Sequence, residues 1–439
     1  MSLMQHFIDT MQRHLSDEGR VVIGFSGGVD SRVLLRLAAL YRAQRPNLEL
    51  LAVHVHHGLS QYADQWLEQC QAWAEQEQIP FVAEYVSLDL ESGDSVEQLA
   101  RDARYRALAS HINTGDILLT GQHLDDQTET FLLALKRGSG PKGLSSMAQL
   151  TSFGEGELLR PLLDVSRTDI EHFAHAQQLV WLEDDSNQDT RFDRNFLRHQ
   201  VIPVITERWP SFSKAVRRSA RLCAKQEQLL AELLQPELQS CLNTFAGIDV
   251  DKLSRCSALK RDQLLRMWLE THTTVLPSET QLQQLWKDVA LAKPDANPTM
   301  SLATGSVRRF RMHLYWIAPH QDITHWRQSV AFDARVLLPD GLGGLTLAQK
   351  TGGDTLMQLD RTTLTEPLVV MFEPEGLSAH PHGRAGSRKL KKLFQEYHIP
   401  SWQRRRTPIL MMGDKVVAVA NLFVDKDFYG SDCELVWDK

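Results

Sequence analysis

The stretch VVIGFSGGVDS at residues 21–31 decides the fold, because it joins an apolar strand to an apolar helix through two consecutive glycines. Glycines let the backbone turn sharply and approach an anion closely, and the N–H groups and dipole of the following helix favour phosphate. Ser26 and Ser31 add hydroxyl donors, so we predict a pyrophosphate site in this loop. Asp30 would repel phosphate unless a cation lay between them, and we therefore predict that Asp30 binds Mg²⁺.

This loop differs from two common phosphate loops. It lacks the Gly-Lys-Ser/Thr ending of a Walker A loop and the G-x-G-x-x-G spacing of a dinucleotide site, which disfavours a kinase or a dehydrogenase. The plainer alternative is a Gly-Gly turn with a serine cap between any strand and helix. The functional interpretation is favoured because strand, loop and helix all fall where a phosphate site needs them.

Short apolar runs alternate with helical periodicity over the first part of the chain. Strands that alternate with helices predict an α/β fold, with a doubly wound parallel sheet and a ligand at the carboxyl ends of its strands. We expect strands at Val21–Phe25, Leu48–His57, Phe81–Leu88 and Asp116–Thr120, and helices at Arg32–Arg45, Tyr62–Gln78, Ser95–Ile112 and Asp126–Leu135.

The 439 residues are too many for one ordinary core, and the pattern divides into three regions. We expect a catalytic domain over 1–215, a mainly helical substrate-binding domain over 216–320 and a small α+β domain over 330–439. The pattern from Phe212 to Trp286 is wholly helical. Beyond it we expect strands within Ser306–Ile317, a helix at Ser387–His398 and strands at Ile409–Met412 and Val416–Leu422.

Composition excludes several classes of protein. No apolar run approaches the length of a membrane span, and the first 15 residues form an amphipathic pattern rather than a targeting segment. The five cysteines are scattered without a C-x-x-C pair, which argues for a reducing cytoplasm and against structural zinc. We therefore expect a cytoplasmic protein that has no membrane partner.

The net charge of −7 conceals two basic islands. Residues 189–225 carry nine Lys/Arg against three Asp/Glu, and residues 384–406 carry eight against one. Such islands can follow a phosphate backbone, although each could instead be a solvated helix face.

Three carboxylates follow the strand that is expected to end at Thr120. Asp125, Asp126 and Glu129 are at helical spacing and can converge at one helix start, where they would suit a cationic substrate or a metal. The alternative is a capping box formed by Asp126 with Glu129. The position of these residues at the same sheet edge as the phosphate loop favours function.

Histidines and arginines complete the set of candidates. We expect His54 to be structural and His57-Gly58 to lie in a nucleotide pocket. Arg101 and Arg104 could meet an anion, although a salt-bridged surface helix would explain them equally well. Arg194 and Arg198 lie one helical turn apart, a spacing suited to bidentate phosphate contacts. In the second basic island, charge lies beside an aromatic side chain, which suits contact with an RNA backbone and bases: Lys389, Lys391, Lys392, Trp402 and Arg404–Arg406.

The motifs together resemble the tRNA(Ile)-lysidine synthetases, bacterial members of the ATP-pyrophosphatase superfamily that the SGGxDS loop alone would indicate. The series is SGGVDS at 26–31, HHGL at 56–59, EQLARDARY at 97–105, GQHLDDQTET at 121–130, KRGSGPKGL at 136–144, LRPLL at 159–163, DDSN at 184–187 and RNFLRH at 194–199. The segment Lys389–Leu410 also resembles the terminal domain of the family. Gln122 departs from the histidine of many relatives, so it receives no catalytic role.

The resemblance implies that ATP adenylates C2 of the wobble cytidine of a tRNA(Ile) with a CAU anticodon. The ε-amine of free L-lysine would then displace AMP, changing codon recognition from AUG to AUA and amino-acid identity from Met to Ile. ATP and Mg²⁺ are the implied cofactors, tRNA would bind to the C-terminal domain, and a homodimer is possible. ATP binding then falls to Ser26, Gly27, Gly28, Val29, Asp30, Ser31, His57 and Gly58. Catalysis falls to Asp30, Asp125, Asp126, Glu129 and Arg194, and substrate or tRNA binding to Arg101, Arg104, His123, Arg191, Arg198, Lys389, Lys392, Arg404 and Arg405.

Two rival functions belong to other classes. An enzyme that adenylates a small molecule would turn over ATP without RNA, but it would have no use for the basic islands. A non-catalytic RNA-binding protein could retain a relict nucleotide fold, but the intact Ser26–Ser31 and Asp125–Glu129 motifs argue against it.

Overall fold

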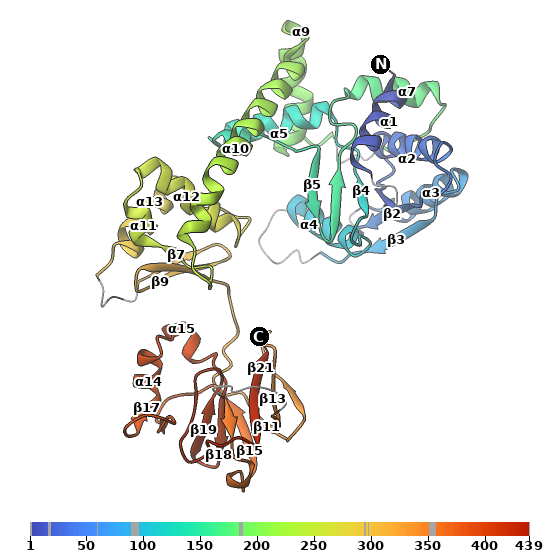
Figure 1. Ribbon diagram of the computed structural model, residues 1–439. Coiled ribbons are helices and arrows are strands. Elements are labelled where there is room, and N and C mark those ends of the chain that lie inside the picture. Colours follow the sequence, from blue (N-terminus) through green and yellow to red (C-terminus); the bar gives the residue numbers. More distant parts are fainter. Residues whose placement is uncertain are drawn as a thin grey trace. The chain divides into compact units, whose positions relative to one another are not determined.

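The computed structural model describes residues 2–15, 19–58, 60–88, 96–183, 188–293, 296, 298–350 and 357–438. The DDSN motif at 184–187 lies outside the described residues. The chain divides into two compact units, residues 1–233 and 234–439 (Figure 1). In the described part, no helix combines the length and the apolar character needed to cross a membrane.

A six-stranded sheet forms the centre of the first unit. Its strand order is β3-β2-β1-β4-β6-β5, and every neighbouring pair except β5 with β6 is parallel. The expected parallel sheet is therefore confirmed, whereas the edge hairpin of β5 and β6, which turns through Gly154, was missed by the sequence pattern. The strands are β1 Val21–Gly24, β2 Leu50–His56, β3 Phe81–Tyr85, β4 Ile117–Leu119, β5 Leu150–Phe153 and β6 Gly156–Leu159.

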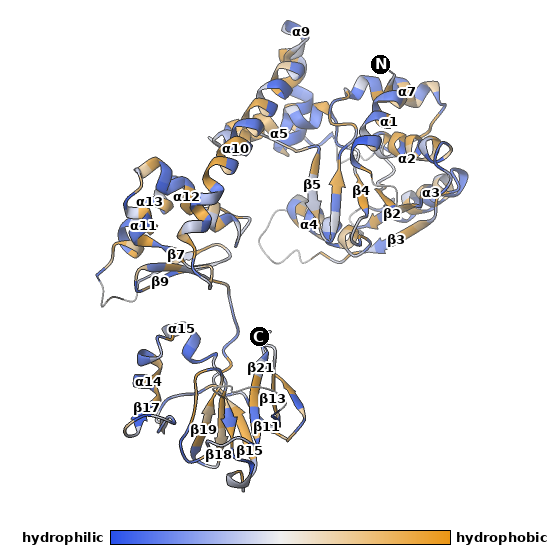
Figure 2. Cartoon of the chain, viewed as in Figure 1, coloured by the Kyte–Doolittle hydropathy of each residue, from blue (hydrophilic) through white to orange (hydrophobic). Residues whose placement is uncertain are grey.

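Helices cover both faces of this sheet (Figure 1). Val21 and Ile23 point to the face packed by α1, α2, α3 and α7, and Val22 points to the face packed by α4, as the alternation of a strand requires. Figure 2 shows apolar residues concentrated in the central strands. These helices are α1 Leu3–His14, α2 Val29–Arg42, α3 Ala63–Gln76, α4 Val96–Ala109 and α7 Arg167–Ala176.

The remaining helices of this unit follow β4 and β6 along the chain. After β4 comes α5 Leu124–Lys136, and after β6 and α7 the chain forms α8 Asp193–Phe196 and the π-helical turn η2 Leu197–Val201. Single π-helical turns occur frequently at functional sites. The other helices are α6 Pro141–Leu144, α9 Ile202–Arg208 and α10 Phe212–Cys241, the last of which crosses the boundary between the units.

The second unit begins with helices packed on a small sheet. The expectation of a wholly helical region up to Trp286 is wrong at one point, because Ile248 and Asp249 form β7, which pairs with β10. Ile248 is fully buried in the helical core, so its apolar side chain is equally compatible with either element. The elements are α11 Val250–Ser254, α12 Ala258–Glu270, α13 Glu279–Gln284, η3 Leu285–Ala290, β8 Thr299–Leu302, β9 Gly305–Phe310 and β10 His313–Ile317.

The rest of the second unit is rich in strands. One sheet has the order β11-β15-β18-β19-β20 and another the order β12-β13-β21-β14, and both contribute to one apolar core. The expected helix at Ser387–His398 is confirmed in shorter form as α14 Leu390–Glu396, because Arg388 and Lys389 form β17. The other elements are β11 Arg327–Val330, β12 Arg335–Leu337, β13 Gly344–Gln349, β14 Gln358–Leu359, η4 Arg361–Thr363, β15 Leu368–Met371, β16 Ser378–Ala379, α15 Ser401–Arg404, β18 Ile409–Met412, β19 Lys415–Val419, β20 Phe423–Val424 and β21 Cys433–Asp438.

Candidate active site

The loop after β1 uses its two glycines differently. Gly27 has φ +88°, and a Cβ there would lie 2.7 Å from Leu182 Cδ1 and 2.8 Å from Cys70 Sγ. Gly28 caps α2 with φ −68°, and the nearest atom to an added Cβ is Ser26 Oγ at 3.9 Å. Gly27 is therefore required by conformation and packing, whereas Gly28 leaves open space before the first turn of α2.

Ser31 braces this loop from within. Its hydroxyl donates to Gly28 O at 3.0 Å and accepts from the Gly27 N–H at 3.1 Å, and Ser26 Oγ lies 3.2 Å away. Val29 is buried in the apolar core, so its side chain is structural. Of the predicted ATP-binding positions, those that line a cavity are Ser26, Asp30, Ser31, His57 and Gly58.

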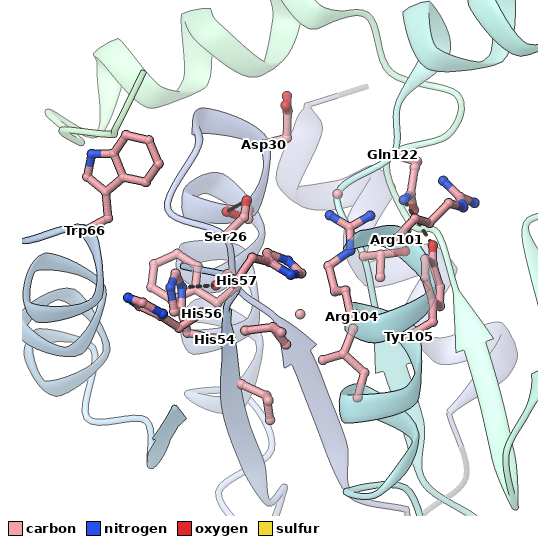
Figure 3. A pocket seen from close by; sticks show the side chains of 18 of the residues that line it. Ser26, Asp30, His54, His56, His57, Trp66, Arg101, Arg104, Tyr105 and Gln122 are labelled. Atoms are coloured by element: carbon pink, nitrogen blue, oxygen red, sulfur yellow. Dashed lines mark hydrogen bonds between the residues drawn. The ribbon is translucent and has the colours of Figure 1, made fainter. Parts of the chain in front are cut away.

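This cavity, of about 400 Å³, lies at the carboxyl ends of β1, β2 and β4 (Figure 3). Its size is in the range of ordinary small-molecule sites. Besides the phosphate loop it is lined by Arg101 and Arg104 from α4, Asp126 from α5, and Arg194 from α8. The topology thus brings the predicted phosphate loop and part of the predicted carboxylate cluster into one space.

Arg101 and Arg104 line this cavity. If they belonged only to a salt-bridged surface helix, their side chains would have no reason to face a cavity. Their guanidinium carbons lie 5.1 Å and 5.5 Å from the ring centroid of Tyr105, within cation–π range. Burial lowers the pKa of Arg104, and the nearby Arg101 and Arg194 lower it further. Three guanidinium groups therefore face the space that an anion would enter.

His54 and His57 both line the cavity but have different hydrogen-bond partners. His54 is buried, and its Nδ1 lies 2.9 Å from Phe25 O, so it fixes the end of β1. His57 lines the cavity, and its buried Nδ1 has no hydrogen-bond partner among the described residues. Burial and the neighbouring Arg104 lower the pKa of His57 to about 4. The His57 ring is therefore neutral near pH 7 and can accept a hydrogen bond.

The start of α5 corrects the capping alternative. The helix begins at Leu124, and the carboxylate that accepts the backbone N–H of the residue before it is that of Asp126 rather than that of Glu129. The His123 N–H donates to Asp126 Oδ2 at 3.0 Å, and the Asp125 N–H lies 3.2 Å from His123 Nδ1. Glu129 is therefore free of a capping role.

His123 lies among three carboxylates. Its ring nitrogens are 3.6 Å from Asp30 Oδ1, 3.5 Å from Asp125 Oδ2 and 3.5 Å from Asp126 Oδ2. Burial alone would lower the pKa of His123, but Asp126, Asp125 and Asp30 outweigh burial and raise it to about 9. A protonated His123 is thus a buried cation that links the phosphate loop to α5.

Glu129 is fully buried and binds two arginines. It accepts from Arg198 at 2.7 Å and 3.1 Å, and Arg194 Nε lies 3.4 Å away. Arg198 also donates to Asp126 Oδ1 at 3.2 Å. The two arginines predicted to bind phosphate are therefore anchored on α5 carboxylates, and Arg194 alone of the two lines the cavity.

Arg167 is a site residue that the sequence analysis missed. Its guanidinium donates to Asp30 Oδ2 at 2.7 Å, and its backbone N–H donates to Asp125 Oδ2 at 2.8 Å. Asp30 Oδ1 is buried without a hydrogen-bond partner among the described residues. Burial raises the pKa of Asp30, although His123 and Arg167 oppose that rise. No spacing in the sequence connects Arg167 with Asp30, because the link exists only after folding.

Five predicted substrate or tRNA residues lie elsewhere. Arg191 pairs with Asp189 at 2.6 Å and does not line the cavity. Arg405 pairs with Glu375, and Arg404 Nε donates to Ile399 O at 3.1 Å, so both have partners within the second unit. Lys389 and Lys392 are exposed at β17 and α14.

Three family models match the chain: a PP-loop domain over residues 2–205, a TilS substrate binding domain over 248–315 and a TilS substrate C-terminal domain over 368–438. Curated relatives named tRNA(Ile)-lysidine synthase match along the whole length. The protein of Vibrio vulnificus (strain CMCP6) is 54% identical over 100% of both chains, and that of Vibrio atlanticus (strain LGP32) is 53% identical over 100% of this chain and 99% of its own. That of Photobacterium profundum is 49% identical over 97% of this chain and 96% of its own. This chain belongs to the tRNA(Ile)-lysidine synthase family.

Proposed function

We propose that this chain uses ATP to adenylate C2 of the wobble cytidine in a tRNA(Ile) with a CAU anticodon. The ε-amine of L-lysine then displaces AMP and forms lysidine, in the cytoplasm where such a tRNA would be processed. One observation carries this proposal: the phosphate loop and one carboxylate of the α5 cluster line the same cavity, through Ser26 and Asp30 of the loop and Asp126 of α5. An anionic nucleotide and a cationic amine therefore have complementary groups within reach of each other.

The ATP half of the site rests on cations and on a neutral acceptor. The triphosphate would meet the loop N–H groups at the start of α2 and the guanidinium groups of Arg101, Arg104 and Arg194. Neutral His57 can accept a hydrogen bond from the nucleoside part. These groups offer an ATP molecule charged contacts for its phosphates and a hydrogen-bond acceptor for its nucleoside part.

The residues also fit a Mg²⁺ ion. Mg²⁺ in nucleotide sites takes one or two carboxylates and completes its shell with waters and phosphates. The buried Oδ1 of Asp30, which accepts no hydrogen bond among the described residues and lies 3.6 Å from His123 Nε2, is such a carboxylate oxygen. When bound there, Mg²⁺ would neutralise negative charge on the departing pyrophosphate. Arg167 can hold the other oxygen of Asp30 in place.

The lysine half of the site rests on Asp126. Glu129 is occupied by Arg198 and Arg194, which makes Glu129 a positioning residue for those arginines. Asp126 also accepts from Arg198 and from the His123 backbone N–H, but unlike Asp125 and Glu129 it lines the cavity, where an ammonium group could reach it. The ordinary pKa of a lysine side chain is about 10.4, so the nucleophile must lose a proton before it attacks. Asp126 is the carboxylate placed to accept that proton.

Substitution of Asp126 tests this assignment. Asp126→Asn should raise the KM for lysine at least about tenfold, because the amide no longer offers a negative charge to an ammonium group. Its pyrophosphate release with ATP and tRNA should change less. Asp193→Asn is a matched control, since Asp193 pairs with Lys136 on the surface. An unchanged KM for lysine in Asp126→Asn would contradict the assignment.

A further inference from the structure

Aromatic side chains gather at one end of the cavity. We call His56, Tyr62, Trp66 and Tyr85 the aromatic rim, of which His56 and Trp66 line the cavity. They come from the end of β2, the start of α3 and the end of β3. Figure 3 shows Trp66 across the cavity from Arg101 and Arg104. His56 and Trp66 therefore lie at one end of the cavity, and Arg101 and Arg104 lie with Tyr105 at the other.

The rings of the rim form two pairs. The His56 and Tyr85 centroids are 5.0 Å apart, and those of Tyr62 and Trp66 are 6.4 Å apart. Asp64 fixes the His56 ring through a contact of 3.0 Å to Nε2. A ring that is already fixed loses little entropy when another ring stacks on it.

Both tyrosines are exposed to solvent. Tyr85 is 69% exposed and Tyr62 is 42% exposed, although each lies against a residue that lines the cavity. Isolated exposed aromatics are common, but here each exposed ring packs against an aromatic residue that lines the same cavity, which is typical of a binding surface. A flat and partly apolar ligand would cover these rings.

We propose that the aromatic rim stacks an unpaired loop base of the RNA substrate, adjacent to the base that enters the cavity. The inference rests on the proposed function, which makes an anticodon loop the substrate. Proteins read single-stranded loops by stacking splayed bases on aromatic rings. The guanidinium groups at the other end attract the phosphates that join such bases. The rim is continuous with the cavity, so one strand of RNA can contact both.

The test measures binding of an anticodon stem-loop with the CAU anticodon to the full-length chain. Tyr62→Ala and Tyr85→Ala should each raise the Kd for this RNA by about five- to a hundredfold, the range for removal of one stacking ring. Tyr62→Phe and Tyr85→Phe should stay close to wild type, because the ring is retained. Phe245→Ala is a control, since Phe245 is 77% exposed and lies in the other unit.

A double-substitution cycle identifies the stacked base. The RNA is made abasic at each unpaired loop position in turn, and each RNA is measured with wild type and with Tyr85→Ala. At one loop position, loss of the base should raise the Kd for the wild-type protein but leave the Kd for Tyr85→Ala the same as with the intact RNA. Effects that add independently at every position would overturn the proposal, as would an unchanged Kd in both alanine variants.

Two further outcomes separate the possible causes. A raised KM for ATP with an unchanged Kd for RNA would assign the rim to the adenine ring and overturn the proposal. A wild-type chain that binds the stem-loop but forms no lysidine would contradict the proposed function, whereas the stacking result would still stand on the binding data alone.

Discussion

At the residue scale, Asp30 is held between competing partners. Arg167 binds one carboxylate oxygen, while the other faces His123 at 3.6 Å without a hydrogen bond. The Asp30 side chain is 25% exposed, but its Oδ1 is buried, and a buried oxygen without a hydrogen bond costs stability. We infer that this cost keeps an oxygen available for a cation.

Loss of the Asp30 charge should stop adenylation. Asp30→Asn should lower pyrophosphate release at least about a hundredfold, since stabilisation of phosphoryl charge by a metal is worth several kcal/mol. Release is measured with ATP, Mg²⁺ and tRNA. Glu171→Gln is the control, because it removes an exposed partner of Arg167 and leaves Asp30 intact. Pyrophosphate release at the wild-type rate in Asp30→Asn would contradict the assignment of Asp30 as a Mg²⁺ ligand.

The neutral His57 ring gives a pH dependence with a defined sign. The pKa of His57 is about 4 in the folded chain and 6.5 ordinarily. Between pH 4 and pH 6.5 the unfolded chain therefore binds a proton at His57, whereas the folded chain does not. The free energy of unfolding should fall as the pH drops from 6.5 to 4, and His57→Gln should lack this component. Because the ring is only partly buried, we expect about 1–2 kcal/mol. Parallel pH–stability curves from urea titrations of the two proteins would contradict this.

Several residues that line the cavity could be predicted from recognisable motifs, but their contacts could not. Residue type and position at a strand end located Asp30, His57 and Asp126 at the cavity. The pairing of Arg198 with Glu129 depends on a contact between α5 and η2, which neither motif encodes alone. Arg167 was missed for the same reason.

At the element scale, the phosphate loop depends on one glycine more than on the other. Gly27→Ala should lower the free energy of unfolding by about 2–4 kcal/mol, because it adds strain at φ +88° to a clash with Leu182 and Cys70. Gly28→Ala is the matched control and should cost about 1 kcal/mol or less, since its φ is ordinary and its surroundings are open. Equal losses in the two variants, measured by urea unfolding, would be incompatible with this description.

The sheet was predictable because its strands are apolar and alternate with amphipathic helices. The β5–β6 hairpin escaped detection because its strands have only four residues each and mix polar with apolar side chains. The start of α5 was placed two residues late because histidine is an uncommon N-cap, and the expected cap was an aspartate.

At the scale of the whole molecule, the second unit carries the basic segment that suits tRNA. Lys389, Lys391 and Lys392 are exposed at β17 and α14. The three-domain division and a homodimer remain predictions, and light scattering tests the latter.

Replacing the three lysines should reduce tRNA affinity in a salt-dependent way. The logarithm of the association constant falls with the logarithm of the salt concentration, with a slope of about −0.9 for each phosphate contact. Alanine at all three positions should therefore make this slope less steep by up to about 3. The KM for ATP should not change, because the cavity proposed to bind ATP lies in the other unit. An unchanged salt slope would show that these lysines do not contact phosphate.

The most direct measurement weighs the nucleosides of the modified RNA. The protein is incubated with ATP, Mg²⁺, L-lysine and a tRNA with a CAU anticodon, and the RNA is then digested and analysed by mass spectrometry. We predict a cytidine that gains the mass of lysine less water, and only when every component is present. Unchanged cytidine despite pyrophosphate release would contradict the account, because the adenylating site would then serve another acceptor.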